Sequence, residues 1–371
     1  MNSAAAKGAS SVTFRDFMES ALYGEGGFYG RRAPKEDFYT APELHPVFGE
    51  TLAGEILTRL DDLERGGAAR PFSIVEMGSG SGLLAEQIIG ALRRDHPGRV
   101  QGVRYVLVER ERKLLVSSVL RLSELGMRIS GASDVSELPP TAGVFFSNEL
   151  VDALPFHLLE RRGDKVHEVY VGSDGATVLG ELSTPELEAY ARSLPEAAQG
   201  LRHAVSLEAL RWLRAVARGM TAGCLITVDY GARMPPCALN PPRAYSKHAE
   251  DDRLTAPGRD LTANVDFETL IQEGAKLGLE MESFSTLGRF LLDRIGSSSP
   301  IRPGRSPGLD RAVTPAPAPG AQAAADAISL LRIKTLIHPD GMGETHKVLI
   351  QRKETATSPL RLLALPVGEG K

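Results

Sequence analysis

The sequence predicts an α/β protein built on a doubly wound parallel sheet. Between residues 72 and 231, short apolar runs alternate with amphipathic helices, and this alternation is typical of parallel strands covered by helices on both faces. The stretch VEMGSGSGLL, residues 75–84, places three glycines directly behind the first apolar run. Of the 371 residues, 42% are hydrophobic and 24% are charged, a balance that favours a folded enzyme over a disordered or fibrous chain.

The N-terminal region is predicted to be helical. The stretch VTFRDFMESALYGEGGFYG begins as an amphipathic helix with Phe14, Phe17, Met18 and Leu22 on one face, and it ends in a glycine-rich turn. The stretch PELHPVFGETLAGEILTRLDDLERGG then predicts one second, long helix that ends at the glycine pair 66–67.

The predicted sheet begins with a strand over residues 72–77, followed by a helix over 81–94. The stretch RYVLVER predicts the next strand, and a helix over 111–125 follows it. GVFFSNEL and GCLITVDYG predict two further strands. The helix before the last of these strands carries an apolar face of Leu207, Leu210, Leu213 and Val216.

An inserted, β-rich cap is predicted after the fourth strand, because FHLLERRGDKVHEVYVGSDGATVLGEL contains short alternating runs separated by Gly-Asp and Asp-Gly turns. A Pro-, Gly-, Ser- and Ala-rich stretch later in the chain buries too little apolar surface to order itself and predicts a flexible loop. The predicted division of the chain is a disordered N-terminus (1–11), a helical lid region (12–70), a cofactor-binding core (71–155), an inserted substrate or cap subdomain (156–205), the core continued (206–295), the flexible loop (296–327), a closing helix and strand (328–355) and a C-terminal tail (356–371).

Several classes of protein are excluded by composition. The net charge of −4 and the lack of a long basic stripe argue against a nucleic-acid binder. No apolar run approaches the ~20 residues of a membrane helix, and the first residues lack the apolar core of a secretory signal, so we expect a cytoplasmic protein without membrane insertion. The two cysteines, Cys224 and Cys237, predict neither a disulfide framework nor a metal site.

The glycine-rich turn predicts a cofactor site. Gly78, Gly80 and Gly82 lie where a parallel strand leads into a helix, and glycines there let the backbone approach a ligand. The nicotinamide fingerprint G-x-G-x-x-G is not met, because Leu83 occupies the position of its third glycine. The spacing of Glu76 and the three glycines resembles instead the first motif of the seven-stranded methyltransferases, whose cofactor is S-adenosylmethionine. A plain strand-to-helix turn is the alternative.

Two further acidic residues follow the next strands. Glu109 ends YVLVE, where a carboxylate accepts hydrogen bonds from ribose hydroxyls; the alternative is a solvated charge at a helix start. Asp134 lies one loop later, at the position where methyltransferases contact the adenine amine, and a helix N-cap is its alternative role.

Taken together, the motifs resemble the MidA family, methyltransferases related to the mitochondrial complex I assembly factor that methylates arginine. The matching stretches, in the family's order, are FMESALYGEGGFYG, DFYTAPELHPVFGE, EMGSGSG, SNELVDALPFH, VDYG, RAYSKH, LTANVDFETL and HPDGMGETHKVL. The chain departs from the family at Glu36, where Gly is usual, and at Leu287, where Gln is common. The resemblance implies a seven-stranded Rossmann-like sheet, transfer of a methyl group to arginine of a protein, and a substrate such as a subunit of respiratory NADH dehydrogenase.

The resemblance also implies a catalytic loop in SNELVDALP, with Asn148, Glu149 and Asp152. Paired carboxylates suit arginine because its guanidinium is a permanently charged, planar fork that they bind bidentately. Asp152 has an alternative role as a helix cap.

The remaining candidates are a lid and a strand end near the substrate. The stretch DFYTAPE supplies the lid residues Asp37, Thr40 and Glu43, and Tyr29 is expected to pack beneath this lid. Asp229 and Tyr230 follow the fifth strand, and all of these residues are expected near substrate and cofactor. Other functions stay open: a methyltransferase of small molecules or other side chains, a non-catalytic assembly or scaffold factor, and a nicotinamide dehydrogenase.

Overall fold

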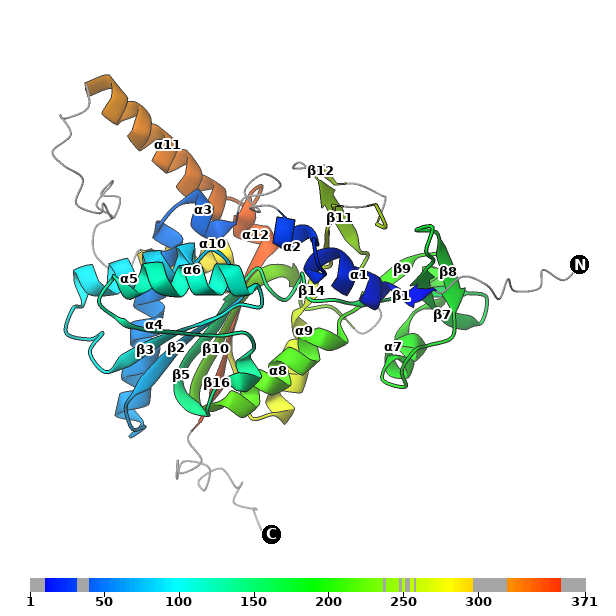
Figure 1. The fold of residues 1–371 in the computed structure, drawn as a ribbon, viewed down its shortest axis with the longest axis horizontal. Helices are drawn as coiled ribbons and strands as arrows, with labels where there is room; N and C mark the ends of the chain where they lie inside the picture. Colours follow the sequence, from blue (N-terminus) through cyan, green and yellow to red (C-terminus); the bar gives the residue numbers. More distant parts are fainter. Residues whose placement is uncertain are drawn as a thin grey trace, which may run out of the picture.

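The centre of the molecule is an eight-stranded sheet with the order β15–β16–β10–β5–β2–β3–β4, in which β14 pairs with β10 off this path (Figure 1). The computed structural model describes residues 11–31, 40–235, 238–246, 249–250, 254–256, 258–295 and 319–354. The strands of this sheet are β2 (Phe72–Met77), β3 (Val103–Val108), β4 (Arg128–Ala132), β5 (Thr141–Asn148), β10 (Met220–Ala232), β14 (Val265–Asp266), β15 (Glu280–Thr286) and β16 (His346–Lys353). The predicted α/β class is confirmed, and the sheet is mostly parallel.

Strand direction decides which residues meet at the edge of the sheet. β4, β3, β2, β5 and β10 pair in parallel, whereas β16 runs antiparallel to both β10 and β15. The register places Val228 opposite Asn148 and Tyr230 opposite His346. The carboxyl ends of β5 and β10 therefore lie beside the amino end of β16.

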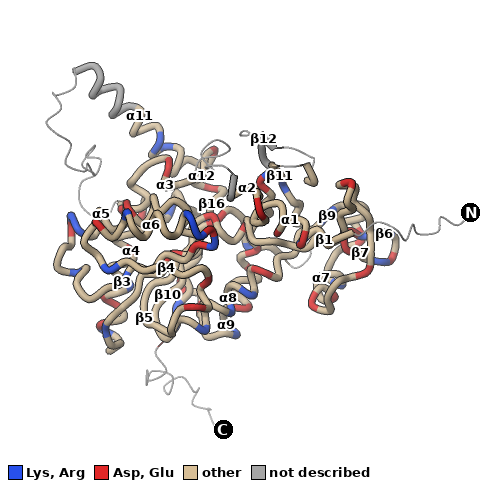
Figure 2. The backbone as a smooth tube through the Cα atoms, viewed as in Figure 1, with Lys and Arg blue, Asp and Glu red and all other residues tan. Residues whose placement is uncertain are grey.

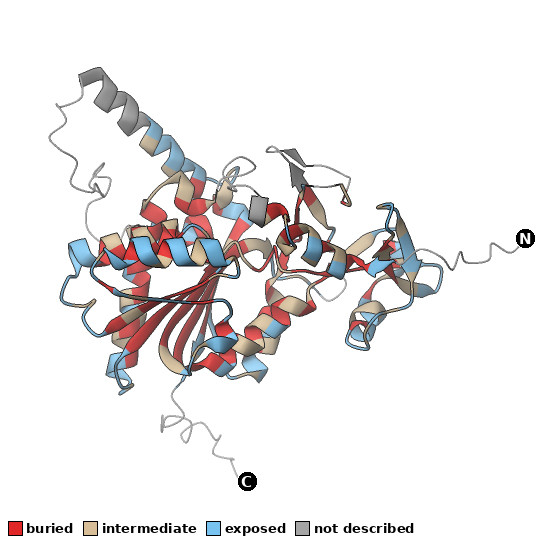
Figure 3. Cartoon of the chain, in the orientation of Figure 1, coloured by how far each residue is buried: buried red, intermediate tan, exposed pale blue. Residues whose placement is uncertain are grey.

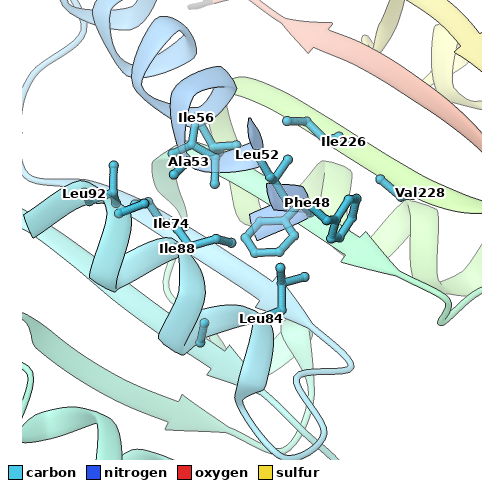
Figure 4. Packing of buried hydrophobic residues seen from close by; sticks show 14 of the residues in the cluster. Phe48, Leu52, Ala53, Ile56, Ile74, Leu84, Ile88, Leu92, Ile226 and Val228 are labelled. Carbon is cyan, nitrogen blue, oxygen red and sulfur yellow. The ribbon is translucent and has the colours of Figure 1, made fainter. Parts of the chain in front are cut away.

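Helices cover both faces of the sheet, as the alternating pattern predicts. The helices of the core are α4 (Val47–Arg65), α5 (Leu83–Asp95), α6 (Arg112–Ser123), α8 (Leu207–Gly219), α9 (Phe267–Lys276) and α10 (Leu287–Ile295). Figure 4 shows Phe48 and Leu52 of α4 packed among side chains of α5, β2 and β10. The central strands β2, β5 and β10 are largely buried, while α6 turns an exposed face to solvent (Figure 3). Lys and Arg are interspersed with Asp and Glu along most elements (Figure 2).

The long second helix predicted in the N-terminal region is two helices, and that prediction is wrong. α3 (Ala41–Leu44) ends at His45, which is extended at φ −159° and ψ 139°, and α4 starts after Pro46. Proline lacks a backbone N–H and disfavours helical backbone in the residue before it, so the chain turns between the two helices. The break separates α3 from the core helix and leaves it at the carboxyl edge of the sheet.

A second sheet flanks the core. It has five strands, in the order β1–β7–β6–β9 with β8 paired to β7. Its elements are β1 (Val12–Thr13), β6 (His157–Arg162), β7 (Lys165–Val171), β8 (Thr177–Gly180), α7 (Leu187–Ser193) and β9 (Arg202–Val205). The N-terminal helices α1 (Phe14–Tyr23) and α2 (Phe28–Arg31) pack against it through a shared apolar cluster that includes Phe14, Met18 and Phe156. The first helix and the inserted strands thus form one body at the side of the core.

Short elements complete the edge of the molecule. β11 (Arg243–Ser246), β12 (Ala249–Glu250) and β13 (Asp260–Thr262) form a three-stranded sheet. α11 (Pro319–Ile337) projects away from the body of the molecule, and α12 (Met342–Thr345) leads into β16 (Figure 1). Because α11 begins at Pro319, the end of the segment predicted as a flexible loop is helical; its alanines favour helix, which the prediction overlooked. Residues 296–318 lie outside the described residues.

None of the helices in the described ranges combines the length and apolar character that crossing a bilayer requires.

Candidate functional site

The glycine-rich turn connects β2 to α5 through three residues with left-handed backbone. Gly78, Gly80 and Gly82 have φ values of 71°, 50° and 73°, a region that side chains with a Cβ rarely adopt. A Cβ on Gly78 would lie 2.9 Å from Cδ1 of Leu150, whereas a Cβ on Gly80 would meet no atom of the described residues within 4 Å. The turn therefore packs against the loop after β5 on one side and faces open space at Gly80.

Glu76 lies inside the core beneath this turn. It is 3% exposed, and the Tyr105 hydroxyl donates a hydrogen bond of 2.6 Å to its Oε2. Burial raises the pKa of Glu76 to about 8, and nearby Glu109 adds to the shift. A carboxyl in this position is held in its neutral form near pH 7.

Glu109 and Asp134 follow β3 and β4. Glu109 Oε2 accepts a 2.8 Å hydrogen bond from the backbone N–H of Gly80, and its Oε1 accepts another of 2.8 Å from Glu111. Glu109 is therefore tied to the glycine turn and is not simply a solvated charge. Asp134 is exposed, and its Oδ1 accepts a 2.8 Å hydrogen bond from the backbone of Ser136, which is the N-cap role given as its alternative.

The loop after β5 carries an acidic cluster. Glu149 has a left-handed backbone at φ 48°, and its N–H donates to Val228 O at 2.9 Å. Its Oε1 accepts hydrogen bonds from the N–H of Ala41 at 3.0 Å and from Nδ2 of Asn148 at 3.1 Å. Burial raises the pKa of Glu149 to about 7. This side chain thus links the end of β5 to the first turn of α3.

Asp229 is fully buried and holds the same loop from β10. Its Oδ2 accepts hydrogen bonds from the backbone N–H groups of Val151 at 2.9 Å and Asp152 at 3.4 Å, and its Oδ1 accepts one from Tyr230 at 2.9 Å. Burial raises the pKa of Asp229 well above its ordinary value, with a further contribution from Asp152. Burial likewise raises the pKa of Asp152 to about 6. Three acidic side chains therefore gather at one end of two strands.

Within the described part of the chain, no lysine or arginine forms an ion pair with Glu149, Asp152 or Asp229. Several buried polar atoms at this place also lack a hydrogen-bond partner among the described residues: Asp152 Oδ1, Asn148 Oδ1, His346 Nε2 and, in the glycine turn, Ser79 Oγ. Leaving such atoms without partners costs free energy, roughly 1–3 kcal/mol each. The arrangement suits a ligand that is cationic and rich in N–H donors.

The predicted lid residues lie on two sides of this cluster. Thr40 caps α3, with its N–H donating to Glu43 Oε2 at 3.1 Å, so Glu43 is held by the capping interaction. The Tyr29 hydroxyl donates to Asp260 Oδ1 at 3.1 Å, and its ring stacks on Tyr23 with centroids 5.4 Å apart. Tyr230 is next to Asp229, while Asp37 lies outside the described residues.

Sequence reasoning missed three residues that the fold brings to the site. Tyr23 donates a 2.9 Å hydrogen bond to Ala153 O, Asp260 binds Tyr29, and His346 lies 4.0 Å from Glu149. His346 belongs to HPDGMGETHKVL, one of the matching family stretches, which was the available signal for it. Tyr23 likewise belongs to the matching stretch FMESALYGEGGFYG, whereas no signal in the sequence marks Asp260.

Comparison with known proteins identifies a family model and relatives that resemble this chain. A family model with the description "Putative S-adenosyl-L-methionine-dependent methyltransferase" matches residues 51–285. The chain is 28% identical over 290 residues to the mitochondrial "Protein arginine methyltransferase NDUFAF7 homolog" of Drosophila melanogaster, covering 69% of this chain and 65% of that relative. It is 26% identical over 309 residues to the human NDUFAF7, covering 71% and 66%. The chain thus spans just under two thirds of the length of these two relatives.

A solved structure shares the fold. A protein from Burkholderia thailandensis, crystallised with S-adenosyl-homocysteine, superposes with a TM-score of 0.70 at 23% identity, covering 93% of this chain and 88% of that one. This likeness confirms the predicted methyltransferase-type sheet.

The cytoplasmic location predicted from the sequence is contradicted, because the relatives from Drosophila melanogaster and Homo sapiens are named as mitochondrial. The prediction rested on the lack of a membrane-length apolar run and of a secretory signal core, and neither feature distinguishes the cytoplasm from the mitochondrion.

The family match covers more than half of the 371 residues and includes the glycine turn, the acidic loop and the strands that hold both. The chain therefore belongs to this family of S-adenosyl-L-methionine-dependent methyltransferases.

Proposed function

We propose that this protein transfers a methyl group from S-adenosylmethionine to an arginine side chain of a protein. The observation that carries the proposal is the acidic cluster of the partly buried Glu149 and the buried Asp152 and Asp229, which has no lysine or arginine partner among the described residues and lies against the glycine turn. Relatives named as protein arginine methyltransferases support the same acceptor.

The cofactor's place is the glycine turn with the acidic residues around it. When bound, S-adenosylmethionine supplies the methyl group from a sulfonium centre. The residues present fit such a ligand: the space in front of Gly80 is open, and Ser79 Oγ is buried without a partner among the described residues. Glu109 keeps lone pairs for ribose hydroxyls beyond those used by Gly80 and Glu111, and Asp134 lies one strand further on for the adenine.

Glu76 is a supporting residue in this proposal. Its side chain is buried under the turn and bonded to Tyr105, so it props Gly78 from below without reaching the open side of the turn.

The acceptor is held by Glu149 and Asp152, with Asn148 beside them. Glu149 Oε1 is already occupied by two N–H donors, so its Oε2 and the unpartnered Asp152 Oδ1 are the oxygens left for a guanidinium fork. Two carboxylates that grip the fork fix its plane and aim one nitrogen at the methyl group, and this positioning supplies most of the rate of a methyl transfer. Asp229 holds the loop in place through backbone hydrogen bonds.

The start of α3, with Thr40 and Glu43, serves as the lid in this proposal, while Asp37 lies outside the described residues. Thr40 and Glu43 cap α3, and Ala41 at its start donates directly to Glu149, so the same short helix covers the site and orients the acceptor carboxylate. Tyr29 and Tyr230 wall the acceptor space from the other sides. Exclusion of water by these groups strengthens the electrostatic grip on the guanidinium.

The partner in this proposal is a protein substrate. Family resemblance favours a subunit of respiratory NADH dehydrogenase, and its identification rests on a search for methylated arginine.

The testing experiment combines calorimetric titration of S-adenosylhomocysteine with radiolabel transfer from S-adenosylmethionine into peptides that differ only in Arg or Lys. We expect one-site binding, and label in the Arg peptide that Glu149→Gln removes while cofactor affinity stays unchanged. If S-adenosylhomocysteine binds but label appears only in small molecules, the acceptor is a small molecule and not a protein arginine. If it binds and no label is transferred, a non-catalytic assembly role is favoured. No binding of S-adenosylhomocysteine would remove the proposal.

A further inference from the structure

His346 stands at the acidic cluster without an assigned role. It is the first residue of β16, pairs in register with Tyr230 of β10, and is 7% exposed. Its ring meets that of Tyr230 edge-on, with centroids 5.7 Å apart. The ring is therefore fixed by packing, and its orientation is set by the sheet.

The hydrogen bonds around His346 favour one tautomer of its ring. Thr345 Oγ1 lies 3.1 Å from His346 Nδ1 and donates its hydroxyl hydrogen to Gly341 O at 3.3 Å. A hydroxyl has one hydrogen, so only the tautomer with its proton on Nδ1 lets Thr345 keep both contacts, donating to Gly341 O and accepting from the ring. Nε2 is left with a lone pair, provided that the ring is neutral.

The ring is neutral near pH 7. Burial lowers the pKa of His346 to about 4, and the neighbouring Lys347 adds to the shift. The other titratable groups that face it are Glu149 from the loop after β5 and Tyr230 from β10.

Two acceptors consequently lie close to each other. His346 Nε2 is buried without a partner among the described residues, and it lies 4.0 Å from Glu149 Oε2. An ionised Glu149 and a lone pair on Nε2 offer no donor to each other, and 4.0 Å is beyond a direct hydrogen bond. One nitrogen with two N–H groups satisfies both atoms at once.

We propose that His346 is a specificity-determining residue: its Nε2 accepts one N–H of the acceptor nitrogen whose second N–H binds Glu149 Oε2. The inference rests on the proposed function and deepens it. A terminal guanidinium nitrogen supplies two coplanar N–H groups, whereas a hydroxyl or thiol supplies at most one hydrogen. The site therefore discriminates by the number of N–H donors as well as by charge.

The test uses Nα-acetylarginine amide as the probe, with S-adenosylhomocysteine present at saturation. His346→Leu removes the acceptor and keeps an apolar side chain, while His346→Gln restores a polar group near the position of Nε2. We expect the affinity for the probe to fall about tenfold or more in His346→Leu and to recover partly in His346→Gln, because a hydrogen bond to a charged group is lost and regained. Unchanged affinity for S-adenosylhomocysteine verifies that each variant is folded.

A spectroscopic readout separates this role from simple packing. In protein labelled with ¹⁵N-histidine, His346 Nε2 should give the resonance of an unprotonated nitrogen, and it should shift when the probe is added. Thr345→Val should mix the two tautomers. Equal probe affinity in wild type and His346→Leu, or a protonated Nε2, would overturn the inference and leave the proposed function intact. Failure of the wild type to bind the probe while it binds S-adenosylhomocysteine would overturn both.

Discussion

Glu149, at the centre of the acidic cluster, has a strained backbone. Its left-handed conformation at φ 48° is rare for a residue with a side chain and costs roughly 1–3 kcal/mol. The N–H bonded to Val228 and the loop bonded to Asp229 hold it there. Strain maintained by such contacts is common at functional sites, and it directs this carboxyl toward α3 and His346.

The first prediction concerns Glu149 and pH. Because burial raises its pKa to about 7, the ionised form that grips a guanidinium accumulates only as pH rises toward that value. We expect kcat/KM for an arginine peptide to increase with pH up to about 7 and then level off. Glu149→Gln should lower kcat/KM by about a hundredfold or more. A profile that is flat across this range in the wild type would exclude Glu149 as the titrating acceptor group.

The second prediction concerns Gly80. A valine there adds a side chain to space that is open in the structure and, in our proposal, belongs to the cofactor. We expect Gly80→Val to abolish calorimetric binding of S-adenosylhomocysteine.

Gly67→Val is the matched control for that change. Gly67 also has a positive φ, of 78°, and open space around it, but it lies in the turn after α4. Equal loss of binding in both variants would mean that backbone strain, and not occupation of the pocket, is responsible.

At the scale of elements, helices α4 and α5 approach each other closely at one glycine. A Cβ on Gly49 would lie 2.5 Å from Cβ of Gln87 on α5, while Gln87 Nε2 donates to Pro42 O at 2.8 Å. The contact between the two helices and the anchoring of α3 therefore depend on the same side chain. This arrangement explains how a four-residue helix keeps its place over the site.

The third prediction compares two glycines of α4. We expect Gly49→Ala to destabilise the protein by about 1–3 kcal/mol, because the added methyl group overpacks the interface with α5. Gly54→Ala should stabilise it by about 0.5–1 kcal/mol, since its Cβ meets no atom within 4 Å and alanine is the better helix former. Urea unfolding measures both; loss of stability in Gly54→Ala would contradict the packing explanation.

The fourth prediction concerns the tether of α3. Gln87→Leu removes the hydrogen bond to Pro42 and should weaken the placement of Ala41 against Glu149. We expect KM for an arginine peptide to rise several-fold with little change in affinity for S-adenosylhomocysteine. An equal loss of both affinities would show instead that the change disturbs the core beneath the glycine turn.

For the whole molecule, buried carboxyls make stability depend on pH. Burial raises the pKa of Glu76 to about 8, of Glu149 to about 7 and of Asp152 to about 6. The folded state thus binds these protons more tightly than the unfolded chain, whose carboxyls titrate near ~4. Their contribution is complete below that value and is lost as pH rises through about 6 to 8.

The fifth prediction follows from this sign. We compare the wild type with one triple variant that carries Glu76→Gln, Glu149→Gln and Asp152→Asn, in the absence of ligands. The free energy of unfolding of the wild type, relative to that of the triple variant, should decrease as pH rises from about 5 to about 8.5. Urea unfolding at the two pH values measures the difference. A difference that stays constant or rises with pH would mean that these groups are ionised in the folded protein.

Local patterns in the sequence determined the fold class and the cofactor motif. The strand and helix periodicities of the core can be seen directly in the sequence. The three glycines predict a turn because a positive φ is a local property that favours glycine. Two local signals were nevertheless misjudged: the break at Pro46 and the helical start of α11 at Pro319.

Glu149, Asp152 and Asp229 were expected near the substrate from the sequence, but their contacts, and the other side chains that join them, were decided only by the tertiary structure. Asp229, Asp260 and His346 are far from Glu149 in the chain, and the parallel pairing of β5 with β10, the antiparallel pairing of β16 and the packing of α2 bring them together. Their shifted pKa values exist only after burial, since desolvation and neighbouring charges are properties of the folded core. Sequence spacing alone gives neither the contacts of these side chains nor their pKa shifts, because both depend on which strands become neighbours.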